Sequence, residues 1–217
     1  MAMATVRVQV DESDLYRREA MGAFAHEVRT PLTSIRMVLE LARRQSEGEA
    51  LQLDAELANM LIVSIDDLQL LADDLQETSR LERGRLPISR GPCDLAWATG
   101  AAVALLGSHI ALSGLPVEPL SGPWDEVVLP RVLAGFATAA NRVGDGLGVV
   151  RFSMVTGGET VTLAFESGER SGPPAPIAAD LGFGFFRSRQ FVAAMGGSVG
   201  VDRTERHVCI TVRLPLR

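Results

Sequence analysis

The sequence contains no lysine: all 21 of its basic residues are arginine. Any position at which a related protein uses lysine can therefore hold only arginine here. The 27 acidic residues outnumber the basic ones and give a net charge of −6. A protein that binds the phosphate backbone of a nucleic acid needs a basic face. The composition therefore argues against nucleic acid as the main partner.

Cysteine and histidine are also scarce. Cys93 and Cys209 stand far apart and belong to no paired motif, which favours reduced thiols over a disulfide or a metal site. The three histidines, His26, His109 and His207, lack the spacing of metal ligands. We therefore expect no bound metal, and we interpret His109 and His207 as structural residues.

No apolar run in the sequence is long enough to cross a membrane. The best candidate, "AWATGAAVALLGSHIAL" (96–112), is interrupted by Gly, Ser and His and is shorter than the ~20 residues of a membrane-spanning helix. We interpret it as a buried helix that runs into a strand. No basic leader followed by a short apolar segment opens the sequence. We therefore expect a soluble, cytoplasmic protein.

Two stretches carry the spacing of amphipathic helices. Apolar residues recur every three or four positions between residues 15 and 45, and a second stripe runs from Leu57 to Leu75. Together they predict a helical hairpin, which Gly84 and Pro87 end. Because each helix covers only one stripe of the other, we expect two copies to pair into a four-helix bundle, as a homodimer. The first stripe comprises Met21, Phe24, Val28, Leu32, Ile35, Leu39 and Ala42.

The pattern changes after Pro87. Strand-like runs at 148–155, 160–167, 197–202 and 207–216 alternate with helical patterns at 94–106, 126–142 and 184–195. This order predicts an α/β sandwich in which helices cover one face of a mixed sheet. We divide the chain into an N-terminal stub (1–10), the helical hairpin (11–86) and the α/β domain (87–217). The acidic pairs Asp66–Asp67 and Asp73–Asp74 of the hairpin are interpreted as a solvated face.

The stretch "FAHEVRTPLTSI" (24–35) carries the chemistry. His26 and Thr30 share a helix face between the apolar positions, so His26 should project outward. Pro31 has no N–H to donate to the carbonyl of Glu27, and we expect the helix to bend there. An exposed neutral imidazole is a nucleophile toward phosphorus, and a nearby carboxylate such as Glu27 can orient the ring or take up a proton. The Thr30 hydroxyl could position a water or a phosphoryl oxygen.

This stretch resembles the phosphoacceptor box of bacterial two-component sensor histidine kinases, whose core reads His-Glu-x-x-Thr-Pro-Leu. The resemblance covers residues 15–85. It implies that His26 is phosphorylated and passes the phosphoryl group to an aspartate of a response-regulator receiver domain. It also implies that Glu27 assists proton transfer and that Thr30 matters for hydrolysis of the regulator's phosphate.

A docking patch for the receiver is predicted on the same helix. Thr33, Met37 and Leu41 follow His26 on the predicted outward side, and an apolar side chain such as Met37 at the surface is a candidate contact. An ordinary surface methionine explains Met37 equally well.

The α/β part resembles the ATP-binding domain of the same kinases, with departures at the sites that hold nucleotide. Ala139 stands where the resemblance places a magnesium-binding Asn, and Gly135 replaces another Asn. The adenine box Asp-x-Gly-x-Gly is reduced to "ESGER", with Glu166 for the Asp and Arg170 for the second Gly. The following lid, "SGPPAPIAADLG", is short. If a nucleotide binds, the candidates to hold it are Asn141, Glu166, Gly168, Gly182 and Gly184.

These departures decide the predicted function. Transfer of a phosphoryl group from ATP depends on a bridging metal, and Ala139 has no oxygen to offer one. We therefore predict a histidine phosphotransferase with degenerate kinase architecture, which carries a phosphoryl group on His26 between receiver aspartates and needs no cofactor. One alternative is a divergent sensor histidine kinase that uses ATP and magnesium. The other is a non-catalytic dimeric scaffold that binds receivers.

Overall fold

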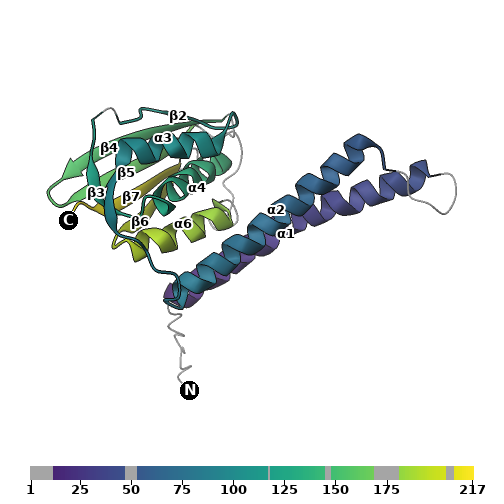
Figure 1. Ribbon diagram of the computed structural model, residues 1–217, viewed down its shortest axis with the longest axis horizontal. Helices are drawn as coiled ribbons and strands as arrows, with labels where there is room; N and C mark the ends of the chain where they lie inside the picture. The colour runs from purple at the N-terminus through teal and green to yellow at the C-terminus, as the bar shows by residue number, and fades with distance from the viewer. Residues whose placement is uncertain (1–11, 47–52, 117, 145–147, 169–180, 204–207) are drawn as a thin grey trace, which may run out of the picture.

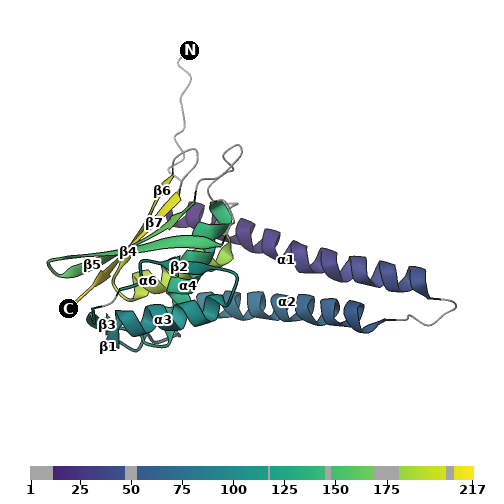
Figure 2. The same cartoon turned by 90° about the horizontal axis from the view of Figure 1, so that it is seen from above.

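The computed structural model describes residues 12–46, 53–116, 118–144, 148–168, 181–203 and 208–217. A long helical hairpin stands out from an α/β domain, and the two meet at the end of the hairpin away from its turn (Figures 1 and 2). The strand-like stub, the first ten residues of the short lid (171–180), Arg170 and His207 lie outside the described residues.

The hairpin consists of α1 (Glu12–Gln45) and α2 (Ala55–Glu82). α1 runs through Pro31 without interruption, and the expected bend stays a prediction. α2 begins where Asp54 Oδ1 accepts the backbone N–H of Leu57 at 2.8 Å, which satisfies one of the free donors of the first turn. It ends just before Gly84, whose φ of +64° suits glycine. The two predicted helices are therefore confirmed.

Much of the predicted apolar stripe of α1 faces solvent in the single chain. Toward the turn, Val38, Ala42 and Leu57 form a small buried cluster. Met21 and Leu32, by contrast, are 50% and 51% exposed. α2 leaves a similar set of apolar side chains uncovered, namely Ile62, Val63, Ile65 and Leu70. A hairpin with so much exposed apolar surface fits the expected pairing with a second copy, which stays a prediction.

The α/β domain is built on a five-stranded mixed sheet. Its order is β2-β4-β5-β7-β6, with β2 and β4 parallel and the other neighbours antiparallel. The strands are β2 (Ala111–Ser113), β4 (Val149–Gly157), β5 (Thr160–Ser167), β6 (Ser198–Arg203) and β7 (Val208–Pro215). β1 (Gly91–Asp94) and β3 (Ser121–Trp124) form a separate antiparallel pair. The sequence pattern did not predict β3.

Three helices cover one face of this sheet: α3 (Leu95–Leu106), α4 (Val128–Val143) and α6 (Phe183–Ala194) (Figures 1 and 2). Alternate residues of β5 and β7 point into the core, where Phe165 and Ile210 are fully buried. The buried Phe136 of α4 packs against Phe165 with 5.9 Å between ring centroids. The predicted α/β sandwich is confirmed.

The α4 helix is fixed at its start by Asp125. Its Oδ1 accepts the N–H groups of Val127 and Val128, and its Oδ2 accepts the N–H of Ser89 at 2.8 Å. The carboxylate thereby caps α4 and ties down the segment that leaves the hairpin. Pro130 lies in the first turn of α4, where the missing N–H costs no hydrogen bond.

Cys93 and Cys209 are free thiols, as predicted. Burial raises the pKa of the Cys93 thiol to about 11, so it remains protonated and unreactive at neutral pH. His109 is exposed in the turn between α3 and β2. Within the described part of the chain, none of the helices combines the length and apolar character that a membrane crossing demands.

Candidate functional site

The predicted phosphoacceptor lies on the surface of α1. His26 and Thr30 are exposed, while Glu27, which lies about 100° further round the helix, is half-buried. The prediction that His26 projects outward is confirmed. An imidazole in this position is accessible to a donor or acceptor of phosphoryl groups carried by another protein.

The proposed docking patch is also accessible. Met37 and Leu41 are 48% and 38% exposed, and Thr33 is exposed with its hydroxyl donating to the carbonyl of Arg29 at 2.8 Å. These residues are spaced by four along α1, so they share one face. The patch therefore offers apolar contact surface on the side of His26 toward the hairpin turn.

Glu27 points to the α/β domain, where it forms an ion pair with Arg142. The Nη1 of Arg142, in the last turn of α4, donates to Glu27 Oε1. The side chain of Glu27 is only 17% exposed and that of Arg142 is 39% exposed. The carboxylate next to the phosphoacceptor is thus bound by a cation from the other domain.

This ion pair lines a cavity of about 290 Å³ between the hairpin and the α/β domain. Two of the five predicted nucleotide-binding residues, Gly182 and Gly184, line the same cavity, as does Ala139. Its walls carry four charged side chains: Glu27, Asp74, Arg142 and Arg187.

The other three predicted nucleotide-binding residues are engaged elsewhere. Asn141 Oδ1 accepts the N–H of Gly148 at 2.9 Å. Glu166 on β5 lies opposite Arg151 on β4, with 3.6 Å between its Oε2 and the arginine Nη1. Gly168 follows the end of β5. None of the three lines the cavity with Gly182 and Gly184.

The residues of this cavity do not fit a complex of ATP with magnesium. Ala139 offers no ligand atom, and Asn141 uses its carbonyl oxygen on Gly148. Glu27 and Asp74 would repel phosphates, while Arg142 and Arg187 already pair with carboxylates. Across the described ranges, no three His, Cys, Asp or Glu side chains gather as metal ligands.

A cluster of four charged side chains joins α2 to α4 and α6. Glu77 accepts two hydrogen bonds from Arg131, at 2.9 and 3.1 Å, and two from Arg187, at 2.9 and 2.7 Å. Asp74 Oδ1 lies 3.1 Å from Arg187 Nε. The side chain of Arg187 is only 7% exposed. The interpretation of Asp73–Asp74 as a solvated face is therefore wrong for Asp74, which helps to neutralise a buried arginine.

The pKa values of the two carboxylates of this cluster shift in opposite directions. Burial raises the pKa of Asp74 above its ordinary value, and the attraction of Arg187 and Arg131 only partly offsets it. Burial also tends to raise the pKa of Glu77, but the hydrogen bonds and charges of Arg187 and Arg131 outweigh it and lower the pKa. Glu77 is thus the acid that holds the two arginines.

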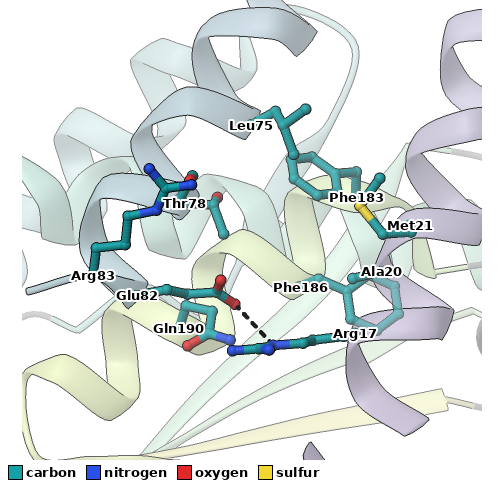
Figure 3. A pocket seen from close by; sticks show the side chains of 11 residues that line it. Arg17, Ala20, Met21, Leu75, Thr78, Glu82, Arg83, Phe183, Phe186 and Gln190 are labelled. Carbon is teal, nitrogen blue, oxygen red and sulfur yellow. Dashed lines mark ion pairs between the residues drawn. The ribbon is translucent and has the colours of Figure 1, made fainter. Parts of the chain in front are cut away.

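A second cavity, of about 430 Å³, lies between α1, α2 and α6 (Figure 3). Met21 of α1, Leu75 of α2 and Phe183 of α6 point toward one another at one side. At the other, Arg17 and Glu82 approach to 3.9 Å. None of the predicted site residues lines this cavity. It marks the junction of the hairpin with α6 and is separate from the surface that presents His26.

Sequence reasoning missed Arg142, Arg131 and Arg187. Arg187 stands among the apolar residues of a buried helix, "FGFFRSRQFV", and a charge at such a position is a signal that it needs a partner. Arg142 gives no comparable signal, because it lies in an ordinary last turn of a helix.

Comparisons with known proteins agree with a phosphoacceptor hairpin that is followed by an α/β domain. The family model described as His Kinase A (phospho-acceptor) domain matches residues 16–84. The probable sensor histidine kinase TcrY of Mycobacterium tuberculosis is 28% identical over 92% of this chain and 46% of its own length. The histidine protein kinase DivJ of Caulobacter vibrioides is 24% identical over 99% of this chain and 40% of its own length. The chain spans less than half the length of these two relatives.

Solved structures share the fold. The histidine kinase AdeS of Acinetobacter baumannii superposes with a TM-score of 0.67 at 18% identity, over 88% of this chain and 98% of the other. The histidine kinase ThkA, solved in complex with the response regulator protein TrrA, gives a TM-score of 0.60 at 16% identity, over 100% of this chain and 68% of the other. Residues 16–84 thus match a phospho-acceptor domain, and the chain is similar over most of its length to two-component sensor histidine kinases.

Proposed function

We propose that this chain is a phosphotransfer protein of two-component signalling in which His26 carries the phosphoryl group. The observation that carries the proposal is the exposed His26 on α1, within a matched phosphoacceptor domain and followed by Glu27 and Thr30. The final acceptor is an aspartate of a response-regulator receiver domain. The complex of ThkA with TrrA supports a partner of this class.

The chemical step is a transfer between nitrogen and oxygen. A ring nitrogen of His26 attacks phosphorus with its lone pair, the P–N bond forms, and the bond from phosphorus to the donor breaks with its electrons. The attack leaves the ring positively charged, and Glu27 is the adjacent carboxylate that can accept or hold its proton. In the onward step the ring regains its proton, an aspartate oxygen of the receiver attacks the same phosphorus, and the P–N bond breaks as the neutral imidazole leaves.

The source of the phosphoryl group separates two candidate functions. The relatives favour the ATP-dependent kinase, which the sequence prediction placed second, because they are named sensor histidine kinases. The cavity favours the phosphotransferase, which takes the group from another receiver, because Ala139 offers no metal ligand and the Glu27 carboxylate, paired with Arg142, would repel phosphates.

Labelling experiments distinguish these functions. The purified chain is incubated with labelled ATP and magnesium, and in parallel with a receiver domain that has been phosphorylated by a small-molecule donor. Acid-labile label on His26 from ATP supports the kinase, and label from the receiver alone supports the phosphotransferase. His26→Gln should abolish labelling in either case. A wild-type chain that takes label from neither donor, while still binding receivers, would leave only the scaffold.

A further inference from the structure

The ion pair between Glu27 and Arg142 joins a side chain of the α/β domain to the carboxylate that follows the phosphoacceptor in the sequence. The two residues are 115 positions apart in sequence, yet Arg142 Nη1 donates to the carboxylate that directly follows His26. In the described part of the chain, the second oxygen of Glu27, Oε2, has no hydrogen-bond partner. One oxygen is therefore held, and the other is free to accept a proton or a hydrogen bond.

The backbone of Gly182 packs directly against this ion pair. It has a φ of +76°, and a Cβ atom built on it would lie 2.3 Å from Arg142 Nη1 and 2.5 Å from Glu27 Oε1. Any larger residue would displace both charged groups. The backbone at the start of α6 therefore approaches the ion pair as closely as glycine permits.

The contact also rests on a junction held at several points. Glu77 of α2 binds Arg131 and Arg187 at once. Phe24 of α1 meets Phe183 of α6 edge to face, with 5.3 Å between ring centroids. α4 is thus fixed relative to α1, and an arginine in its last turn can hold Glu27 in one orientation.

We propose that Arg142 is a positioning residue for phosphotransfer at His26, acting through Glu27. The inference rests on the proposed function. Arg142 binds Oε1 and fixes the side chain, so that Oε2 remains available to the imidazole ring without the cost of ordering a free glutamate. As the P–N bond forms and the donor leaves with the electrons of its bond to phosphorus, Oε2 accepts the proton of the ring. The α/β domain then contributes a side chain to the reaction although its own nucleotide residues have diverged.

The test uses the full chain and phosphoramidate, a small donor that phosphorylates histidine with loss of ammonia. The initial rate of acid-labile phosphate formation on His26 is measured at saturating donor for the wild type, Arg142→Gln, Glu27→Gln and the double variant. Arg142→Gln should slow the reaction about tenfold, the scale expected when a reacting group loses its orientation. The double variant should be no slower than Glu27→Gln, because both changes remove the same contribution.

Further variants separate positioning from a structural role. Arg142→Lys keeps the cation and should recover part of the rate, and Gly182→Ala should slow it by displacing the pair. Arg213, exposed on β7, provides the matched control, and Arg213→Gln should react like the wild type. Thermal unfolding midpoints should match between Arg142→Gln and Arg142→Lys, so that a loss of fold cannot explain their difference in rate.

The outcomes distinguish this inference from the proposed function. If the wild type acquires phosphate on His26 and Arg142→Gln reacts equally fast or faster, Arg142 does not position Glu27 for the reaction, and the inference fails alone. Additive effects of Arg142→Gln and Glu27→Gln would overturn it as well. If neither phosphoramidate nor a phosphorylated receiver places phosphate on His26 of the wild type, the proposed function fails and takes the inference with it.

Discussion

Arg187 of α6 donates to Glu77 of α2 through both its Nε and its Nη2, at 2.9 and 2.7 Å from the same carboxylate oxygen. Arg131 of α4 donates to both carboxylate oxygens of Glu77. One carboxylate of the hairpin thereby holds two helices of the α/β domain. The cluster explains how a buried arginine is tolerated among the phenylalanines of α6.

Removing the charge of Glu77 should destabilise the protein strongly. Glu77→Gln keeps the shape of the side chain but leaves the buried Arg187 with only Asp74 as a counter-charge. We expect a loss of about 3 kcal/mol in the free energy of unfolding, because breaking a buried pair strands a charge. Chemical denaturation measures it. Glu40→Gln is the matched control, because Glu40 forms a solvent-exposed ion pair with Arg36 at 3.1 Å. Its loss should lower the free energy of unfolding by less than about 0.5 kcal/mol. Equal losses in the two variants would contradict a special role for the cluster.

The pH dependence of stability should change in opposite directions when each acid of the cluster is neutralised. The pKa of Glu77 in the folded protein lies below its ordinary 4.5, so its stabilisation is present above that pH and is lost as the pH falls through the folded pKa. The pKa of Asp74 lies above its ordinary 3.8, so the folded protein binds this proton more tightly than the unfolded chain does. Protonation of Asp74 therefore stabilises the folded protein as the pH falls. Compared with the wild type, Glu77→Gln should therefore lose less stability as the pH is lowered, and Asp74→Asn should lose more. Denaturation midpoints measured from neutral pH to below pH 4 provide the comparison. Parallel curves for the two variants would show that the assigned directions are wrong.

The sequence predicted most of the fold because its periodicities are local. The stripes of α1 and α2 and the alternation along β5 and β7 depend on residues a few positions apart, and each reports its own element. The separate strand β3 has the sequence "SGPW", in which Gly and Pro conceal a strand that exists only through its pairing with β1.

The contacts around His26 could not be predicted in the same way. The phosphoacceptor stretch itself is continuous, and its exposure follows from helical spacing. The pair Glu27–Arg142 and the pair Glu77–Arg187 join residues 115 and 110 positions apart, so they depend on how the hairpin meets the α/β domain. The same packing explains why Asp74, predicted to be solvated, pairs with Arg187 instead.

Replacing Gly135 by a larger residue, such as the asparagine that the resemblance places there, should destabilise the protein because there is no room for a side chain. A Cβ on Gly135 would lie 2.3 Å from Ser188 Oγ and 3.3 Å from the carbonyl oxygen of Gly184. Gly135→Ala should therefore cost about 1–3 kcal/mol of stability through overpacking, measured by chemical denaturation.

Ser188→Ala should compensate for Gly135→Ala, because it removes the hydroxyl of Ser188 that the new Cβ would approach. This buried hydroxyl has no hydrogen-bond partner among the described residues, so its removal should be neutral or stabilising. Gly135→Ala should then be tolerated in the Ser188→Ala background. If Gly135→Ala is equally costly with and without Ser188, the close approach of α4 and α6 does not determine this position.

Pairing of two hairpins should depend on the exposed apolar face of α2. Ile65 is 53% exposed in the single chain, and Ile65→Arg would place a charge in the expected four-helix bundle. We expect the wild type to sediment as a dimer and the variant as a monomer. Trp97→Arg is the control, because Trp97 is 55% exposed on α3, away from the hairpin. A wild type that sediments as a monomer at all concentrations would contradict the homodimer.

The docking patch on α1 should determine how well receivers exchange phosphoryl groups with His26. Met37 is 48% exposed and contributes little to the fold, so Met37→Asp should leave the unfolding free energy within about 0.5 kcal/mol of the wild type. It should nevertheless weaken receiver binding by about tenfold, because an apolar contact would be replaced by a charge that loses its water. Titration calorimetry with a cognate receiver measures the affinity, and phosphoramidate measures the intrinsic reactivity of His26, which should not change. Val155→Asp, at a 67% exposed position on β4, serves as the control that preserves binding. If Met37→Asp binds receivers as tightly as Val155→Asp does, the contact surface lies elsewhere on the hairpin.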